Sequence, residues 1–146
     1  MENSTLENFE VIIFMNSALS HEKILVVDDE AYAREITQQL LNNYYATVFT
    51  AASALEGLEK LRIHRPHLIV SDIGMPQMNG HQFIRKIRSL PPHRGGLTPA
   101  IALSGFTQPQ DRVKSLEAGF QHHLTKPVDY QTLLDAVAGI LRCPDI

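Results

Sequence analysis

Five short apolar runs alternate along the chain with segments of helical periodicity, and this alternation constrains the fold more than any other feature. The runs expected to form strands are Lys23–Val27, Thr47–Thr50, about His67–Ser71, Ala100–Leu103 and His122–Leu124. Their length and their β-branched residues favour buried strands over helices. Strands that alternate with helices form βαβ units with right-handed crossovers. The sequence therefore predicts an α/β domain built on a parallel sheet of five strands.

The segments between these runs carry two helical signals, capping residues and apolar stripes. Ser53 and Glu56 have the spacing of a capping box, and Asp129 is the expected cap of the last helix. Thr107 is the expected cap of the fourth helix. The inward faces are expected at Tyr32, Ala33, Ile36, Leu40 and Leu41; at Ala54, Leu58 and Leu61; at Phe83, Ile84 and Ile87; at Val113 and Leu116; and at Leu133, Leu134, Val137, Ile140 and Leu141. The basic residues of the third helix are expected on a solvated face: Arg85, Lys86 and Arg88.

Length and composition bound the class of protein. The chain has 146 residues, 44% of them hydrophobic and 20% charged, which is ordinary for one globular domain. The net charge of −3 gives no reason to expect a nucleic-acid partner. The apolar run Val11–Met15 is too short to insert into a membrane as a span, and no Lys or Arg precedes it, which argues against a secretory signal. The single cysteine, Cys143, excludes an internal disulfide and fits a cytoplasmic, reducing compartment.

The chain is expected to divide into an extension and one domain. Residues 1–22 have no clear period of two or 3.6, so they are expected to be an N-terminal extension or linker. Within them, Val11–Met15 fits an extra strand, a helical turn or the end of a linker, and the sequence does not choose among these. Residues 23–142 are expected to form the domain.

Polar side chains follow four of the predicted strands at the point where each strand ends. Asp28 and Asp29 follow the first strand, Asp72 the third, Ser104 the fourth and Lys126 the fifth. Because the carboxyl ends of parallel strands share one edge of the sheet, we expect these side chains to converge on one shallow pocket. Each has an ordinary explanation by itself, such as a helix cap for the acidic pair or a surface position for the lysine. Their joint order and placement favours a functional site.

The converging groups suit a divalent cation and a phosphoryl group. Three adjacent carboxylates repel one another unless a cation joins them, and hard oxygen ligands suit Mg²⁺ or Mn²⁺. The cation and Lys126 would neutralise phosphoryl oxygens, and Ser104 would donate a hydrogen bond to a third. Asp72 would attack phosphorus. The pattern predicts transfer of a phosphoryl group to Asp72.

Four motifs resemble, in order and spacing, the receiver domain of two-component response regulators: KILVVDDE, SDIGMPQMNG, ALSG and LTKPV. The resemblance covers about residues 23–141. It implies a flavodoxin-like (βα)5 three-layer sandwich with the strand order 2-1-3-4-5. It also implies a phosphorylation-controlled module rather than an enzyme that acts on external substrates. Such a module takes a phosphoryl group from a histidine kinase or a histidine phosphotransfer domain and then changes its binding to a downstream protein.

The resemblance assigns roles around the phosphorylation site. Asp72 matches the phosphoacceptor. Direct Mg²⁺ ligands are matched by Asp29, Asp72 and the backbone carbonyl of Gly74, while Asp28 matches the acid that holds the metal partly through water. Gly74 and Phe106 occupy the two positions that flank the path of the water that removes the phosphoryl group. The resemblance therefore links both residues to the lifetime of the phosphorylated state.

A second set of roles concerns the switch. Ser104 matches the switch hydroxyl, and Lys126 matches the lysine that contacts the phosphoryl group. The bond between Lys126 and Pro127 is usually cis in this family. The position three residues before the lysine is often Tyr or Phe, whereas here it is His123, which is smaller and can charge near neutral pH. The face expected to meet a downstream protein is made by the fourth helix, the fifth strand and the fifth helix.

Two other functions are alternatives to the receiver. A phosphatase of the haloacid-dehalogenase type also uses an aspartate nucleophile and Mg²⁺, but it carries D-x-D, and Gly74 stands where the second Asp is needed. A receiver-like scaffold that is never phosphorylated is disfavoured by the intact acidic pair, Asp72 and Lys126. The run SGFTQPQDRVKSLEAGFQHHLTKPV favours the receiver of a hybrid histidine kinase over a stand-alone regulator. The sequence does not identify the cognate kinase, the downstream target, the signal or the oligomeric state.

Overall fold

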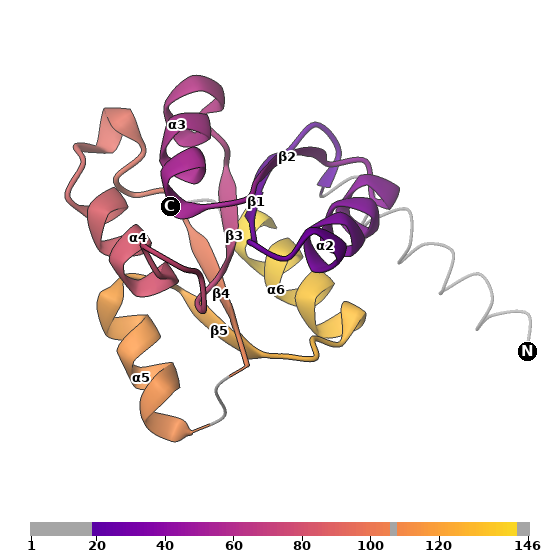
Figure 1. The fold of residues 1–146 in the computed structure, drawn as a ribbon. Helices are drawn as coiled ribbons and strands as arrows, with labels where there is room; N and C mark the ends of the chain where they lie inside the picture. Colours follow the sequence, from indigo (N-terminus) through magenta and orange to yellow (C-terminus); the bar gives the residue numbers. More distant parts are fainter. Residues whose placement is uncertain (1–18, 106–107, 143–146) are drawn as a thin grey trace, which may run out of the picture.

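The structure is a computed structural model that describes residues 19–105 and 108–142. Its strands are β1 (Lys23–Val27), β2 (Thr47–Ala51), β3 (Leu68–Asp72), β4 (Ala100–Ser104) and β5 (His122–Thr125). They form one parallel sheet in the order β2-β1-β3-β4-β5 (Figure 1). Its helices are α2 (Ala31–Asn43), α3 (Ala54–His64), α4 (Gly80–Arg88), α5 (Pro109–Ala118) and α6 (Tyr130–Arg142), with a short 3-10 helix, η1 (Pro92–Arg94). The predicted flavodoxin-like fold and strand order are confirmed.

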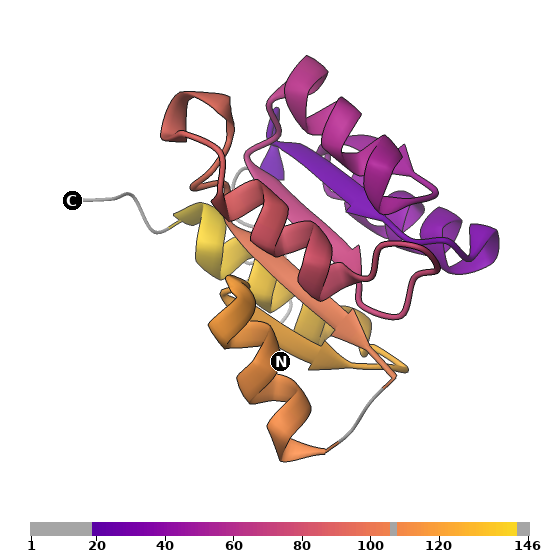
Figure 2. The ribbon, with the colours of Figure 1, turned by 60° about the vertical axis from the view of Figure 1, so that its left-hand side comes forward.

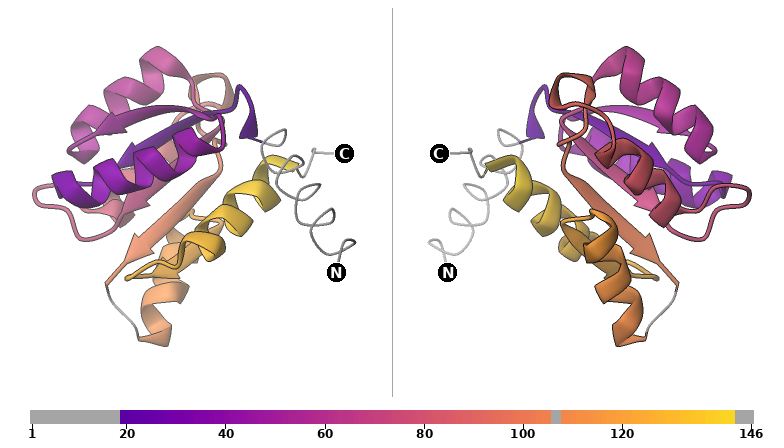
Figure 3. Two further views of the ribbon diagram at one scale, coloured as in Figure 1. Left: turned by 90° about the vertical axis from the view of Figure 1, so that its right-hand side faces the viewer. Right: turned by 90° about the vertical axis from the view of Figure 1, so that its left-hand side faces the viewer.

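Helices cover both faces of the sheet, and each face has its own core. α3, α4 and α5 lie on one face and α2 and α6 on the other (Figures 2 and 3). Because successive side chains of a strand point to opposite faces, Ile69 lies in the same core as Phe83 of α4, while its neighbour Val70 lies in the core that contains Leu41 of α2. All five residues of β3 are buried. A central strand of this kind carries its last residue, Asp72, to the sheet edge in a fixed position.

Two of the predicted helix starts are confirmed. The Ser53 hydroxyl accepts a hydrogen bond from the Glu56 amide at 3.1 Å, and α3 begins at Ala54. The Asp129 carboxylate accepts a hydrogen bond from the Thr132 amide at 3.2 Å, immediately before α6. Each side chain satisfies one of the amides that a first helical turn leaves without a partner in the helix.

The buried face of α5 differs from the prediction. Val113 and Leu116 are 51% and 39% exposed, so their assignment to the inward face is wrong. The residues that α5 buries are Ser115 and Ala118. Both are small, which lets the helix approach its neighbours closely. The larger apolar side chains of α5 point toward solvent.

Three other predictions need correction. The cap of α5 is Gln108 rather than Thr107, which itself lies outside the described residues. Tyr32 is 71% exposed and does not belong to the buried face of α2. Arg88 is not part of a solvated face, because its guanidinium donates hydrogen bonds at 2.8 and 3.0 Å to the Gly119 carbonyl. Burial lowers the pKa of Arg88, and the bonds fix α4 to the turn before β5.

Some predicted features lie outside the described residues: Val11–Met15 with the rest of residues 1–18, Phe106 and Cys143. Leu19, the first described residue, is fully buried in the core beneath α2 and α6. The core therefore includes at least one residue of the predicted extension, and the domain boundary at residue 23 stays a prediction. Within the described ranges, none of the helices is long and apolar enough to cross a bilayer.

Candidate functional site

The ends of β1, β3, β4 and β5 bring the predicted site residues to one edge of the sheet. Asp28 follows β1, Asp72 and Ser104 are the last residues of β3 and β4, and Lys126 follows β5. Asp28, Asp72 and Ser104 are 4%, 7% and 1% exposed, whereas Asp29 is exposed. The edge therefore holds polar side chains that the fold has removed from water, next to one carboxylate that remains in contact with it.

The three carboxylates form a compact group. Asp28, Asp29 and Asp72 each offer one oxygen, and these atoms lie within 4.8 Å of one another. In residues 19–105 and 108–142, no other group of three or more His, Cys, Asp or Glu side chains is gathered closely enough to hold a metal ion. Hard oxygen donors with an open, wet side suit Mg²⁺, which keeps several of its waters. The residues present therefore fit a divalent cation.

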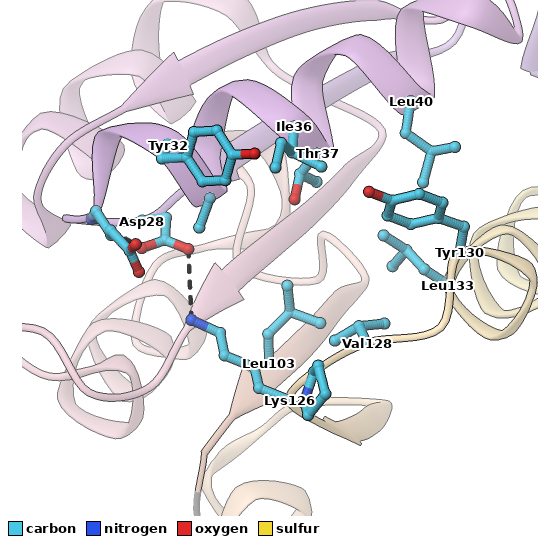
Figure 4. A pocket seen from close by; sticks show the side chains of 13 residues that line it. Asp28, Tyr32, Ile36, Thr37, Leu40, Leu103, Lys126, Val128, Tyr130 and Leu133 are labelled. Atoms are coloured by element: carbon cyan, nitrogen blue, oxygen red, sulfur yellow. Dashed lines mark hydrogen bonds and ion pairs between the residues drawn. The ribbon is translucent and has the colours of Figure 1, made fainter.

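Lys126 neutralises part of this charge. Its ammonium lies 3.0 Å from Oδ1 of Asp72 and 3.5 Å from Oδ2 of Asp28, the second contact being the dashed line in Figure 4. Burial alone would lower the pKa of Lys126, but its hydrogen bond to Asp72 and the charges of both carboxylates outweigh burial and raise it. The ammonium thus stays charged at neutral pH. One lysine does not balance three carboxylates, which leaves the site attractive to a cation.

Burial disfavours the charged form of the Asp28 carboxylate. Burial raises the pKa of Asp28, and the Glu30 amide, which donates a hydrogen bond to Oδ1 at 2.9 Å, partly offsets this effect together with Lys126. The backbone carbonyl of Asp28 accepts a hydrogen bond from the Arg34 guanidinium at 2.8 Å. These contacts fix the carboxylate where β1 turns into α2.

The backbone around the site is tightly constrained. The loop after β3 folds back on the strand, and a Cβ at Gly80 would lie 2.6 Å from the Asp72 carbonyl oxygen, so only glycine fits there. A Cβ at Gly74 would meet nothing within 4 Å, so there is open space beside the carboxylates. The Lys126 amide donates a hydrogen bond to the Ser104 carbonyl at 2.7 Å, and the Lys126-Pro127 bond is cis, as the resemblance implied.

The switch position is linked to two residues that sequence reasoning missed. Nδ1 of His123 lies 2.7 Å from the Ser115 hydroxyl, and Nε2 of His81 lies 2.9 Å from the same oxygen. No motif or spacing marks His81 or Ser115 in the sequence. The one signal in the sequence is a serine in the middle of a helix whose inward residues are expected to be apolar.

A cleft of about 480 Å³ opens beside the acidic group, between α2 and the segment that leads into α6 (Figure 4). Asp28 and Lys126 lie at its site end, and Tyr130, which is 55% exposed, lines it further along. The remaining lining is mostly apolar: Glu30, Tyr32, Ala33, Ile36, Thr37, Leu40, Leu103, Pro127, Val128 and Leu133. The exposure of Tyr32 is explained by its place on this wall.

Comparisons with known proteins agree with the geometry. The family model of the response regulator receiver domain matches residues 24–138. An uncharacterized 14.6 kDa protein of Leptolyngbya boryana is 40% identical over 119 residues, which cover 82% of this chain and 89% of that protein. The Regulator of RpoS of Escherichia coli is 34% identical over 128 residues, 87% of this chain but only 37% of that protein. Among solved structures, the chemotaxis protein CheY4 of Vibrio cholerae superimposes with a TM-score of 0.76 at 30% identity, covering 83% of this chain and 99% of that one. The chain therefore belongs to the response regulator receiver domains of two-component signalling systems.

Proposed function

We propose that Asp72 is the phosphoacceptor and that its phosphorylation controls the binding of a downstream protein. The observation that carries the proposal is the Lys126 ammonium, 3.0 Å from the Asp72 carboxylate at the end of the buried central strand. An ammonium fixed there neutralises charge on the phosphoryl oxygens as it develops. Ser104 ends the neighbouring strand and brings a hydroxyl to the same edge.

The proposed donor is a phosphohistidine of a histidine kinase or a phosphotransfer domain. An oxygen of Asp72 attacks phosphorus in line with the phosphorus–nitrogen bond, which breaks as the oxygen–phosphorus bond forms. The electron pair of the broken bond goes to the ring nitrogen. With a proton on its other nitrogen, the histidine leaves as a neutral imidazole, and the phosphoryl group stays on Asp72.

The proposed metal ligands are Asp28, Asp29, Asp72 and the carbonyl of Gly74. When bound, Mg²⁺ or Mn²⁺ supplies positive charge to the phosphoryl oxygens. Asp29 and Asp72 would bind it directly and Asp28 partly through water. We expect weak binding, because such a cation keeps most of its waters and gains few protein ligands.

The cleft beside the site is a suitable docking surface for the proposed donor, which would place its phosphohistidine at the site end of the cleft. One end carries Asp28 and Lys126, and the rest is an apolar wall formed by α2 and the start of α6. A helix with apolar side chains and a phosphohistidine at its edge would cover this wall while its phosphoryl group reaches Asp72. The two exposed tyrosines, Tyr32 and Tyr130, would become buried on docking.

Output is proposed through the face made by α5, β5 and α6. Ser104 and His123 lie on β4 and β5, next to that face, so a movement at the phosphorylation site reaches it through adjacent strands. The exposed Val113 and Leu116 of α5 offer it apolar contact area. Attachment to a hybrid kinase and a cytoplasmic location stay predictions from the sequence.

Phosphorylation by a small donor tests the proposal. With acetyl phosphate and Mg²⁺, intact-mass spectrometry should detect one added phosphoryl group on the wild-type chain and none on Asp72→Asn. Asp135→Asn removes an exposed carboxylate of α6 and should label like the wild type. Full labelling of Asp72→Asn would overturn the assignment. Repeated turnover of p-nitrophenyl phosphate would instead favour a phosphatase, although Gly74 provides no second acid for that reaction.

A further inference from the structure

One buried hydroxyl joins three elements of the fold at the switch position. Ser115 of α5 is fully buried, and its Oγ lies 2.7 Å from Nδ1 of His123 on β5 and 2.9 Å from Nε2 of His81 on α4. A buried hydroxyl costs stability unless it is hydrogen-bonded, so both contacts help to fix the place of α5. His123 cannot turn away from α5 without breaking one of them.

Proton counting restricts the states of this group. A serine hydroxyl has one proton to donate, and a neutral imidazole has one nitrogen that donates and one that accepts. With both rings neutral, only one contacting nitrogen can accept the Ser115 proton, so at least one ring must donate to Ser115. One added proton keeps this arrangement, since the charged ring becomes the donor. A second added proton leaves the Ser115 proton without an acceptor on either ring. It also places two positively charged imidazoles next to each other, both in contact with the Ser115 oxygen.

We propose that Ser115 and His81 are positioning residues that hold the His123 imidazole against α5, and that a second proton on the two rings releases it. Only one part of this proposal rests on the proposed function: that the released His123 ring takes part in the switch that phosphorylation of Asp72 controls. Phosphorylation and acidification then both release the His123 ring. Phosphorylation acts through Asp72 at the sheet edge, and acidification acts through the contacts of Ser115 on α5 and His81 on α4.

The charges around His81 set the direction of the pH effect. Burial lowers the pKa of His81 from the usual 6.5, and the charges of Arg85 on α4, His123 on β5 and Lys114 on α5 lower it further, while Asp111 on α5 opposes them. His81 is also the second residue of α4, and the positive end of a helix disfavours a cation. The folded protein therefore takes up a proton on His81 with a midpoint below the usual 6.5. The held arrangement is complete above that pH and is lost as the pH falls.

Nitrogen NMR of the imidazoles in the full chain, without phosphorylation, tests the pH effect. Between pH 8 and pH 5 we expect coupled titrations of His81 and His123, the second midpoint below 6.5, with the Ser115 amide shift following the second step. Gln is a good replacement for His81, since its amide reaches the same place as Nε2 and does not titrate. In His81→Gln the contact between His123 and Ser115 should persist through pH 5. His122→Gln, which removes the exposed neighbour, should leave both titrations unchanged.

Ser115→Ala provides the opposite perturbation, because it removes the shared oxygen. The ratio of held to released His123 should fall by about tenfold, the usual effect of losing one buried hydrogen bond. The coupling between the two titrations should vanish. Independent titrations in the wild type, or identical curves in wild type and Ser115→Ala, would overturn the proposal.

Adding acetyl phosphate and Mg²⁺ separates this proposal from the phosphoacceptor assignment. With Asp72 phosphorylated at pH 8, we expect the wild-type His123 nitrogen signal to lose its contact with Ser115, and Asp72→Asn to retain it. A phosphorylated chain in which His123 stays bound to Ser115 would exclude the ring from the switch. A chain that is not phosphorylated at all would refute the proposed function and leave the pH titrations to decide the role of Ser115 and His81.

Discussion

Replacing Asp28 by asparagine should make the metal-free protein more stable, although Asp28 is a proposed metal ligand. The side chain is 4% exposed, and its Oδ1 accepts a hydrogen bond from the Glu30 amide at 2.9 Å. An asparagine oxygen can accept the same bond, so the substitution removes a charge and keeps the contact. Burial raises the pKa of Asp28, which means that the folded protein holds the charged form less readily than the unfolded chain does.

Coulomb energies give the size of the effect. At an effective dielectric constant of about 20, two carboxylates within 4.8 Å, such as Asp28 and Asp72, repel by at least about 3.5 kcal/mol. At the same dielectric constant, the attraction of Asp28 to Lys126 at 3.5 Å is about 4.7 kcal/mol. The difference is only about 1 kcal/mol of attraction, whereas removing one ion from water costs several kcal/mol. We expect Asp28→Asn to raise the free energy of unfolding by about 1 to 3 kcal/mol at pH 7.

Urea unfolding at pH 7 with a chelator measures this gain. Asp135→Asn, an exposed position on α6, is the matched control and should change the free energy of unfolding by less than about 0.5 kcal/mol. Because the folded pKa of Asp28 is raised, the cost of its charge is absent below 3.8, grows as the pH rises from 3.8 to the folded pKa, and is constant above it. The advantage of Asp28→Asn should therefore disappear in strong acid. Added Mg²⁺ at ten times its dissociation constant should stabilise the wild type by about 1.4 kcal/mol and the variant by less.

One outcome would refute the reasoning directly. If Asp28→Asn unfolds at lower urea than the wild type in the chelator, while the control does not change, the attraction of Lys126 exceeds the cost of burying the Asp28 charge. The site would then be balanced without a metal, and the case for a cation from charge alone would fail.

Two further predictions concern the metal and the phosphoryl group. Asp29→Asn should weaken Mg²⁺ binding more than Asp28→Asn, because only the first is assigned as a direct ligand; equal or reversed effects in a calorimetric titration would exchange the two roles. The aspartyl phosphate should decay slowly after the donor is removed, because neither Gly74 nor Phe106 has a group that orients the attacking water. Gly74→Asn, whose side chain enters open space, and Phe106→Glu should both speed the decay, and unchanged or slower decay would contradict the argument.

The position of the candidate site could be predicted because it depends on the backbone. A residue that ends a strand of a parallel sheet, or directly follows it, lies at the carboxyl edge, whatever the direction of its side chain. Asp28, Asp72, Ser104 and Lys126 all follow this rule, and the four motifs fixed the strand order once they were recognised as a set. The cleft beside the site could not be predicted, because it depends on how far α2 stands from the segment before α6.

Apart from the cap of α5, the errors concern helix faces, where one side chain can decide the orientation. Arg88 was assigned to solvent by its charge, yet the carbonyl of Gly119 offers its guanidinium an acceptor across the gap between α4 and β5. A half-buried arginine bonded to backbone oxygens leaves no pattern in the sequence of its own helix. Such a contact joins residues 31 positions apart and becomes visible only when both elements are in place.

The same reasoning explains why α5 exposes its large apolar residues. Successive residues of a helix are turned by about 100°, so Val113 lies about 160° from Ser115 around the axis and Leu116 about 100° from it. Once Ser115 is drawn inward by His81 and His123, Val113 must face solvent and Leu116 must flank the buried side, as their exposures of 51% and 39% record. Hydrogen bonds to one small side chain therefore hold an apolar pair outward on the face proposed for output. A prediction based on hydropathy alone places Val113 and Leu116 on the inward face of α5. It is wrong because it gives no weight to the Ser115 hydroxyl, which contacts the imidazoles of both His81 and His123.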